Sequence, residues 1–207
     1  TRPSSIGTLA LNGDAVVSGQ SISHGDIVAG ALTFSPLANE NGVGYDSFDY
    51  TVNDGLADSL NQATLTIDVT AVDDLPTAAD TTVTLAEDTQ FVFAVADFGF
   101  VDVDAMDQLQ SITITSLASV GKLELNGVEV TIGQNISHDD ILAGALTFTP
   151  LKDGNGIGYD SFQFTVNDGI ADSLVPSTLT IDVTAVNDLP SGTDNTIIAT
   201  EDTPYIF

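Results

Sequence analysis

The densest group of residues that could do chemistry is an acidic segment near the middle of the chain. Asp102 and Asp104 alternate along it, and Asp107 follows shortly after. Calcium is a hard cation that takes about six to eight oxygen ligands, and closely spaced aspartates in a loop suit it. Asp-x-Asp is also common in acidic proteins, so an acidic loop that only turns or caps the backbone is the alternative interpretation.

The whole chain is strongly acidic. It carries 30 acidic and 3 basic residues, a formal net charge of −27. Such a surface repels nucleic acid and anionic membranes, which are bound through Lys and Arg. A hydrophobic content of 43% argues against disorder. The carboxylates either form a solvating acidic coat or await divalent cations that relieve their mutual repulsion.

Other kinds of site find little support. The chain has no Cys, which excludes a thiolate zinc site and a Cys nucleophile. His24 and His138 stand alone in equivalent places, so we expect structural or capping roles. For Tyr45 and Tyr159, each before an Asp, we expect a core or corner position rather than a sugar-binding one. No catalytic motif is present, and no apolar run approaches the about 20 residues that span a bilayer. We expect no enzyme and no membrane insertion.

The elements that must position these residues repeat along the chain. Gly7–Phe93 aligns with Gly121–Phe207 at a constant shift of 114 residues, and roughly 55 of the 87 aligned positions are identical. A repeat of this size can bury its own core. We therefore predict the end of one module at 1–73, a complete module at 74–187 and the first strand of another at 188–207, within a longer array. Boundaries near Phe93 and Phe207 are the second choice.

Each module is predicted to be all-β. Short segments rich in Thr, Val, Ile and Phe alternate and are separated by Gly, Asn and Asp clusters. About seven such strands in roughly 110 residues are typical of an antiparallel Greek-key β-sandwich. One short helix is expected at 137–145 and its counterpart at 23–31, because a Ser precedes acidic residues there. The strands are expected at TTVTLAED, QFVFAVADF, QSITITSL, KLELNG, ALTFTP, SFQFTVNDG and STLTIDVTAV.

The motifs together resemble a known family. Glu-Asp-Thr at 87–89 and 201–203, Asp-x-Asp at 102–104, TVNDG at 165–169 and the AVNDLP linker resemble the cadherin-like, VCBS-type tandem repeats of large RTX-type bacterial surface adhesins. The resemblance covers essentially the whole chain. It implies a cadherin- or immunoglobulin-like sandwich with calcium at each junction, where the ions stiffen the array.

The expected strand order gives the acidic residues a consistent geometry. The first strand leaves the entry linker, the second returns to it, and the sixth places the loop at 167–169 at the same end. Asp102, Asp104 and Asp168 should then converge on Asp73 and Asp74, while Glu87 should approach Asn187 and Asp188 at the far end. The predicted metal ligands are Asp73, Asp74, Glu87, Asp102, Asp104, Asp107, Asp168, Asn187 and Asp188, and the predicted ion is Ca²⁺.

The resemblance has departures. Ala71 and Ala185 stand where an animal cadherin linker has an Asp, and the linker is one residue shorter before its Pro. Two consequences remain possible: each junction binds fewer calcium ions, or other groups supply the missing ligands. The extra ligands would be backbone carbonyls, Asn39, Glu40, Asp153 or Asp160.

We therefore expect an extracellular, calcium-stiffened extender of a bacterial cell-surface adhesin, which spaces a binding domain from the cell. Its partners would be neighbouring repeats, with glycan or cell surfaces engaged through other domains. Direct binding of polysaccharide or a partner cell is the alternative, although the chain has no Trp and only 7% aromatic residues. Residues 1–73 lack the first two strands of a sandwich, so a neighbouring molecule's residues 188–207 lend a strand there or this part is poorly packed.

Overall fold

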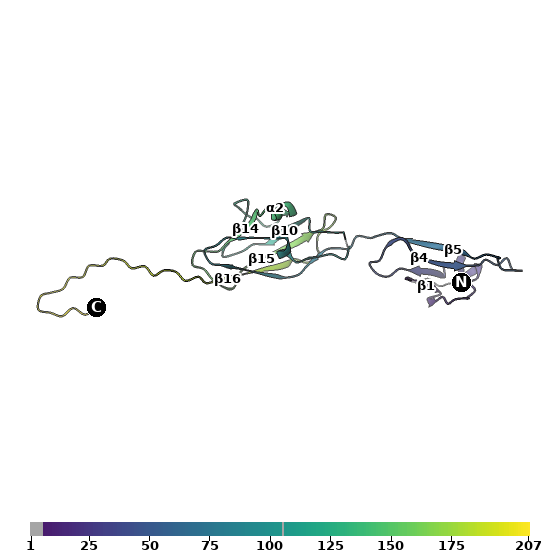
Figure 1. Ribbon diagram of the computed structural model, residues 1–207, viewed down its shortest axis with the longest axis horizontal. Coiled ribbons are helices and arrows are strands. Elements are labelled where there is room, and N and C mark those ends of the chain that lie inside the picture. Colours follow the sequence, from purple (N-terminus) through teal and green to yellow (C-terminus); the bar gives the residue numbers. More distant parts are fainter. Residues whose placement is uncertain (1–5, 105) are drawn as a thin grey trace.

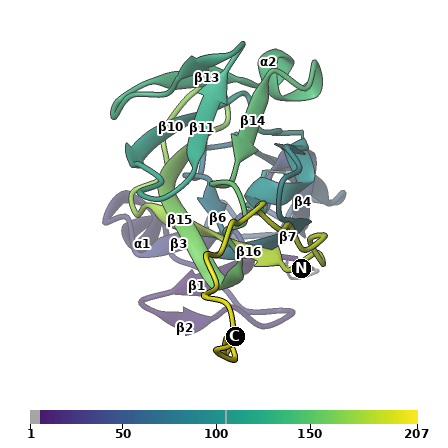
Figure 2. The ribbon, with the colours of Figure 1, turned by 90° about the vertical axis from the view of Figure 1, so that its left-hand side faces the viewer.

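The computed structural model describes residues 6–104 and 106–207. Two β-rich parts, residues 6–73 and 74–187, lie one after the other along the long axis. An extended tail, residues 188–207, follows the second part, so the molecule is elongated (Figure 1). Seen along that axis, the strands of the second part surround its interior (Figure 2). No helix among these residues has the length and apolar character needed to cross a membrane.

The second part is a β-sandwich. A five-stranded sheet has the order β13-β10-β15-β16-β7, and a four-stranded sheet has the order β12-β11-β14-β8. A short pair, β6 with β9, lies at its entry. Its elements are β6 (Thr77–Ala78), β7 (Thr81–Ala86), β8 (Phe91–Val92), the 3₁₀ helix η1 (Val95–Phe98), β9 (Phe100–Val101), β10 (Ser111–Ser116), β11 (Lys122–Leu125), β12 (Val128–Glu129), β13 (Asn135–Ser137), α2 (His138–Leu142), β14 (Leu146–Thr149), β15 (Gly156–Asn167) and β16 (Ser177–Thr184).

Alternating apolar residues of the two sheets form one core. Phe162 and Phe164 of β15 are almost fully buried. The Phe162 ring meets Phe93 edge-on with centroids 5.6 Å apart, and the Phe164 ring meets Phe98 edge-on at 5.2 Å. Edge-to-face aromatic pairs add to the stabilisation from area burial. The alternation expected for β15 and β16 is confirmed, since successive residues of β16 switch between buried and partly exposed.

Two details of the expected sandwich are wrong. β7 pairs with β16 in parallel, with Val83 opposite Ile181, so the sheet is not purely antiparallel. The segment QFVFAVADF is not one strand: it gives β8 and then η1. The Asp97 side chain accepts the backbone N–H of Ala94 at 2.8 Å, and Gly99 closes the turn at φ 54°. A side chain at Gly99 would be strained by this φ and would meet the Ala79 carbonyl oxygen at 2.9 Å.

The first part contains fewer strands. It forms a three-stranded sheet, β2-β1-β3, and the pair β4-β5. Each element lies 114 positions before a similar one in the second part. The elements are β1 (Thr8–Leu11), β2 (Asp14–Ala15), α1 (His24–Val28), β3 (Leu32–Ser35), β4 (Gly42–Tyr50) and β5 (Ala63–Val69).

The expected short helices are confirmed, although each is shorter than its predicted range. Ser23 and Ser137 are the N-caps, and each hydroxyl accepts a backbone N–H, from Asp26 at 3.0 Å and Asp140 at 3.1 Å. The corner role of the tyrosines is confirmed as well. Tyr159 Oη accepts the backbone N–H of Leu151 at 3.0 Å, as Tyr45 does for Leu37.

Candidate metal centre at the entry of the sandwich

Short strand pairing brings the acidic loop back to the linker. β6 and β9 pair with Thr77 opposite Val101, so the residues after β9 return to the residues before β6. On the other sheet, β15 ends at Asn167 beside Ser111 of β10, which places the following loop at the same end. Five carboxylates therefore gather where the first part joins the sandwich, and we call them the entry cluster: Asp73, Asp102, Asp104, Asp107 and Asp168.

Three members of the entry cluster lie very close together. Asp73, Asp104 and Asp107 each offer a carboxylate oxygen, and these oxygens all lie within 4.8 Å of one another. Such a spacing lets one cation contact several oxygens at once. Loss of solvation around its carboxylate raises the pKa of Asp73 above its usual value, and the other four carboxylates raise it further. Partial burial and then the neighbouring carboxylates also raise the pKa of Asp107. Ionisation of Asp73 and Asp107 is therefore disfavoured when no cation is bound.

The other two members have oxygens without partners. Asp168 is only 6% exposed, and its Oδ1 accepts the backbone N–H groups of Ile170 at 2.6 Å and Ala171 at 2.8 Å. Its Oδ2 is buried without a hydrogen-bond partner among the described residues, and so is Oδ2 of Asp102. A buried carboxylate oxygen without a partner is costly. An all-oxygen donor set with such unsatisfied oxygens fits a hard divalent cation.

Asp74 has a different role in the structure from the other predicted ligands. Its backbone N–H donates to Oδ2 of Asp104 at 2.9 Å, and the Asp104 N–H donates to Oδ1 of Asp102 at 2.8 Å. Its own carboxylate is not part of the three-residue group around Asp73. Asp74 therefore fastens the linker to the acidic loop through its backbone.

A second acidic group lies at the exit of the sandwich. Asp88, Asp153 and Asp188 place carboxylate oxygens within 4.8 Å of one another, and all three residues are exposed. Lys152 Nζ donates a hydrogen bond to Oδ2 of Asp153 at 2.9 Å, and this hydrogen bond raises the pKa of Lys152. The sequence predicted Asp188 as a metal ligand and Asp153 as a possible extra ligand. Asp88 was not among the predicted ligands. The available signal was its place in the Glu-Asp-Thr motif, directly after Glu87.

Glu87 is not part of that exit group. Glu87 is buried and uses both oxygens in the fold: Oε1 accepts the Val186 N–H at 2.6 Å, and Oε2 accepts Asn155 Nδ2 at 2.8 Å. It ties the turn after β7 to the residue before β15 and to the residues that follow β16. Asn187 is exposed, and its Nδ2 donates to the Asp188 carbonyl at 3.1 Å.

Asp160, a possible extra ligand by sequence, is an internal anchor. It is buried and accepts the backbone N–H groups of Ser119, Val120 and Gly121 at 2.8, 2.9 and 2.8 Å. Its carboxylate therefore organises the turn before β11. Among the described residues it belongs to neither close group of potential metal ligands.

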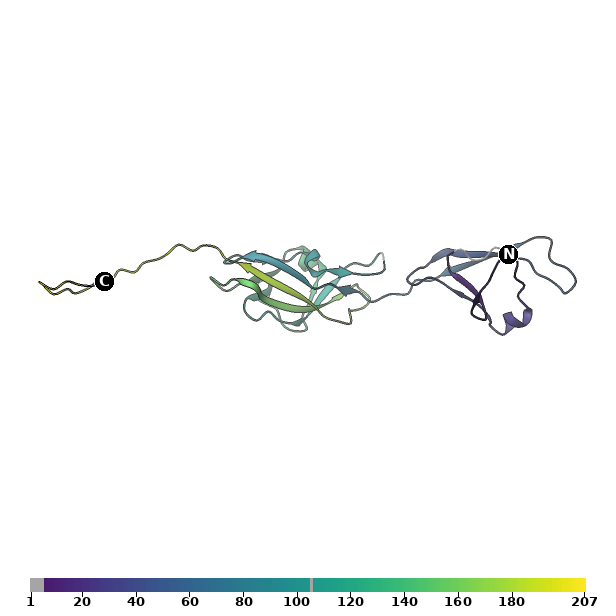
Figure 3. The same ribbon diagram turned by 90° about the horizontal axis from the view of Figure 1, so that it is seen from below.

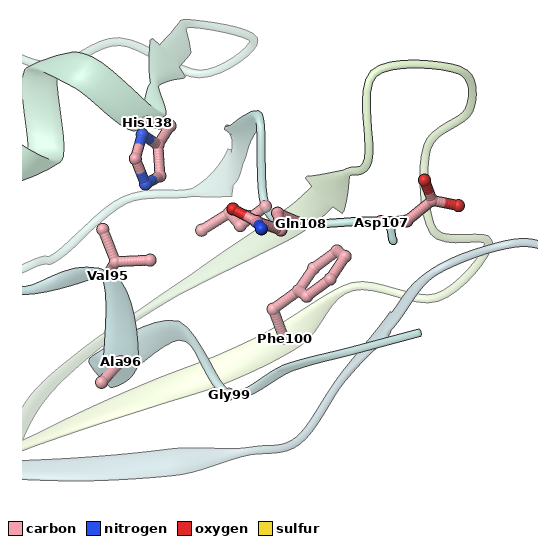
Figure 4. A pocket seen from close by; sticks show the side chains of 8 residues that line it. Val95, Ala96, Gly99, Phe100, Asp107, Gln108 and His138 are labelled. Carbon is pink, nitrogen blue, oxygen red and sulfur yellow. The ribbon is translucent and has the colours of Figure 1, made fainter. Parts of the chain in front are cut away.

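His138 lies away from the entry cluster. Its ring faces a surface pocket between η1 and α2, while the Asp107 carboxylate at the rim turns away from it (Figure 4). The ring Nδ1 is 3.5 Å from the exposed carboxylate of Asp139. The backbone N–H of His138 donates to the Gln110 carbonyl at 2.8 Å, which fixes the start of α2.

Comparison with known proteins identifies the sandwich. A model of the bacterial Ig domain family matches residues 73–184, the range that holds both the entry cluster and the core. No curated protein matches the chain. Bacterial Ig domains are typical of surface or secreted proteins and are typically non-catalytic. The Ig-like, mostly β part of the expected fold is confirmed, and the chain belongs to the bacterial Ig domain family.

Proposed function

We propose that the chain is a calcium-stiffened extender of a large bacterial surface adhesin. The observation that carries the proposal is the entry cluster, in which two buried carboxylate oxygens, on Asp102 and Asp168, have no hydrogen-bond partner among the described residues. The cluster lies where one β-rich part is joined to the next, so an ion there would act on the joint.

The residues of the entry cluster would hold the ion through oxygen atoms alone. Asp73 comes from the linker, Asp102, Asp104 and Asp107 from the loop after β9, and Asp168 from the loop after β15. Bound calcium would supply the positive charge that offsets the repulsion among these carboxylates. Because the ligands come from segments far apart in the chain, binding would fix the linker against the sandwich.

The shape of the molecule supports a spacer role. The two β-rich parts follow each other along one axis, and the tail continues away from the opposite end (Figure 3). The 114-residue repeat places equivalent elements in both parts, as tandem modules would require. The exit group at Asp88, Asp153 and Asp188 would serve the next junction, with neighbouring repeats as the direct partners.

The alternative, direct recognition of polysaccharide, has weaker support. The five phenylalanines Phe93, Phe98, Phe148, Phe162 and Phe164 are almost fully buried, so they offer no aromatic platform at the surface. Recognition of a glycan or cell surface is therefore assigned to other domains of the same extracellular protein.

The test is thermal unfolding of the full chain with calcium, with magnesium and with chelator. We expect a calcium-specific rise in melting temperature, since ligand that binds only the folded state stabilises it. Asp107→Asn should shrink that rise and should raise the melting temperature in chelator, because it removes one repelling charge. Asp14→Asn, an identical charge change on exposed β2, is the matched control and should alter neither value.

Scattering in solution separates a stiffened joint from simple ion binding. We expect the maximum dimension and the rigidity of the particle to increase with calcium in the wild type, and less in Asp107→Asn. A calcium-dependent melting temperature with an unchanged scattering profile would overturn the extender role while leaving the metal site in place. No shift in melting temperature would overturn both.

A further inference from the structure

An apolar groove opens at the entry end of the sandwich, beside the linker. It has a volume of about 560 Å³ and lies between the residues that lead into β6 and the loop that leads into β16. Leu75 and Pro76 line one wall, and Leu174, Val175 and Pro176 line the other. Leu174 is 82% exposed and Val175 is 73% exposed, so aliphatic surface faces water in this groove.

Hydrogen bonds hold the two walls of the groove in place. The Ser177 hydroxyl donates to the Ala78 carbonyl at 2.7 Å, which joins the walls at their base. The backbone N–H of Ser173 donates to the Val166 carbonyl at 2.8 Å, which anchors the second wall to β15. The groove is therefore formed before a side chain enters it, and a preformed site lowers the cost of ordering on binding.

A β-bulge in the first part turns an aliphatic side chain outward. The pairing of β4 with β5 shifts register between Gly42 and Asp46, and Val43 lies in this bulge. Oδ1 of Asp68 accepts the backbone N–H of Gly44 at 2.7 Å, which fixes the bulge. Bulges re-aim side chains, and Val43 is 94% exposed.

The sandwich at 74–187 has the same bulge 114 positions later. The register of β15 on β16 shifts between Gly156 and Asp160, and Oδ1 of Asp182 accepts the Gly158 N–H at 2.6 Å. Ile157 in this bulge is 95% exposed, although the sandwich around it has its full set of strands. The bulge itself therefore presents the aliphatic side chain, whatever strands surround it.

The linker keeps Val43 within reach of the groove. Gly42, next to Val43, pairs with Val69 at the end of β5. The backbone of Asp74 is fastened to Asp104, so only residues 70–73 are free between β5 and the sandwich. An extended chain spans at most about 3.6 Å per residue, so the Cα atoms of Val69 and Asp74 lie within about 18 Å of each other. The two parts meet end to end at this linker (Figures 1 and 3).

Acidic residues on both sides of the joint act against a contact between the two parts. The entry cluster lies at the same end of the sandwich as the groove, and Glu40 and Asp68 are exposed on the first part. Salt screens repulsion between exposed charges, and a cation in the entry cluster would offset part of it. Either condition should therefore favour approach of the two parts.

We propose that Val43 docks into the groove between Leu75 and Leu174 when the joint closes. The occupant of the groove is thus the preceding β-rich part of the same chain, and the two parts are held by an apolar contact in addition to the linker. The inference rests on the proposed spacer role for its purpose, because a packed contact gives a bound cation a fixed arrangement to stabilise. The contact itself is apolar, so it can be tested apart from the metal site.

The first experiment uses cysteines, which the chain lacks. A disulfide needs Cα atoms within about 7 Å, and a short tether gives an effective concentration of about millimolar. Val43→Cys/Leu174→Cys in dilute solution should therefore form a disulfide within one chain, in calcium and also in chelator with high salt. Ile157→Cys/Leu174→Cys is the matched control, because Ile157 has the same place in a bulge at the far end of β15, and it should form none.

Two outcomes of the crosslinking would overturn the docking. One is the absence of a disulfide within the chain in both calcium and high salt. The other is a disulfide between chains in place of the internal one, which would show that a second copy occupies the groove.

The second experiment measures hydrogen exchange at residues 174 and 175 of the full chain. Their amides should exchange more slowly in calcium than in chelator in the wild type. Val43→Asp should abolish this protection, whereas Ile157→Asp, the same change at the other bulge, should preserve it. Neither residue belongs to the entry cluster, so both variants should keep the calcium-dependent rise in melting temperature.

The two proposals fail in different ways. A calcium-dependent rise in melting temperature without protection at 174 and 175 would overturn the docking and leave the metal site in place. Protection in chelator with high salt, together with a melting temperature that ignores calcium, would support the docking and overturn the metal site.

Discussion

The side chain of Asp104 accepts a hydrogen bond from the backbone N–H of Asp74, with the two atoms 2.9 Å apart. Asp104 therefore has two tasks. Its charge belongs to the entry cluster, and its oxygen fastens the linker to the sandwich even without a cation. The Asp104 N–H in turn donates to Asp102 at 2.8 Å, so linker and acidic loop form one connected unit. Substitutions at this residue can separate the two tasks.

Asp104→Asn and Asp104→Ala should differ in chelator. Asn keeps an acceptor for the Asp74 N–H and removes one charge, so the linker amide should stay protected from hydrogen exchange. Ala removes the acceptor as well, at a cost of about 1 kcal/mol, and the Asp74 amide should exchange faster. Both variants should lose calcium response. Equal amide exchange in the two variants would show that the hydrogen bond does not fasten the linker.

Stability without divalent cations should fall as the pH rises through the raised pKa values of Asp73 and Asp107. Their pKa values are raised from 3.8 in the folded chain, so the folded state binds protons more readily than the unfolded state. Their favourable contribution is complete below the usual pKa and is lost above the raised one. In chelator, the double variant Asp73→Asn/Asp107→Asn should have the same melting temperature as the wild type at low pH. Near neutral pH its melting temperature should be higher than that of the wild type.

The measurement is a series of thermal melts in chelator from acidic to neutral pH. Asp14→Asn, whose carboxylate lies outside the entry cluster, serves as the reference for a simple change in net charge. A constant difference between the double variant and the wild type at every pH would contradict the prediction. Added salt should narrow the difference near neutral pH, because it screens the repulsion.

Asp160→Ala should destabilise the sandwich strongly. The buried carboxylate accepts three consecutive backbone N–H groups before β11, and its loss leaves them without an acceptor. We expect a loss of about 2–4 kcal/mol in the free energy of unfolding. Asp182→Ala is the control, since Asp182 accepts a single N–H, from Gly158 at 2.6 Å, and should cost about 1 kcal/mol. Denaturant titration measures both, and equal losses would contradict the anchor role.

Local chemistry in the sequence predicts much of this fold. Alternation predicts β15 and β16, because one face of each strand meets the core and the other meets water. Ser137 before acidic residues predicts the start of α2, because the hydroxyl satisfies a free backbone N–H. The gathering of Asp102, Asp104 and Asp168 near the linker follows from strand direction alone, since strands that run the same way end at the same side.

Other features have no local signal. The parallel pairing of β7 with β16 is decided by which edge remains free after the antiparallel strands have paired, and neither strand encodes that. The alternation of QFVFAVADF suggests a strand, yet Asp97 caps η1 and Gly99 ends it. Asp160 and Glu87 looked like surface ligands by type, but backbone N–H groups bind them in the interior. Acidic residue type alone does not separate an anchor from a ligand.

The two β-rich parts should unfold at different temperatures. Phe162 is 1% exposed in the closed core, whereas its counterpart Phe48 is only partly buried beside the free edge of β5. Phe162→Ala should therefore cost about 3–5 kcal/mol in the free energy of unfolding of the sandwich. Phe48→Ala leaves a smaller cavity in an already open core and should cost less.

Hydrogen exchange read by mass spectrometry assigns each transition to its residues. Amides of residues 6–73 should exchange before those of 74–187 as temperature rises, because fewer buried contacts hold them. Phe48→Ala should lower only the first transition, and Phe162→Ala only the second. One cooperative transition shared by both parts would contradict this order.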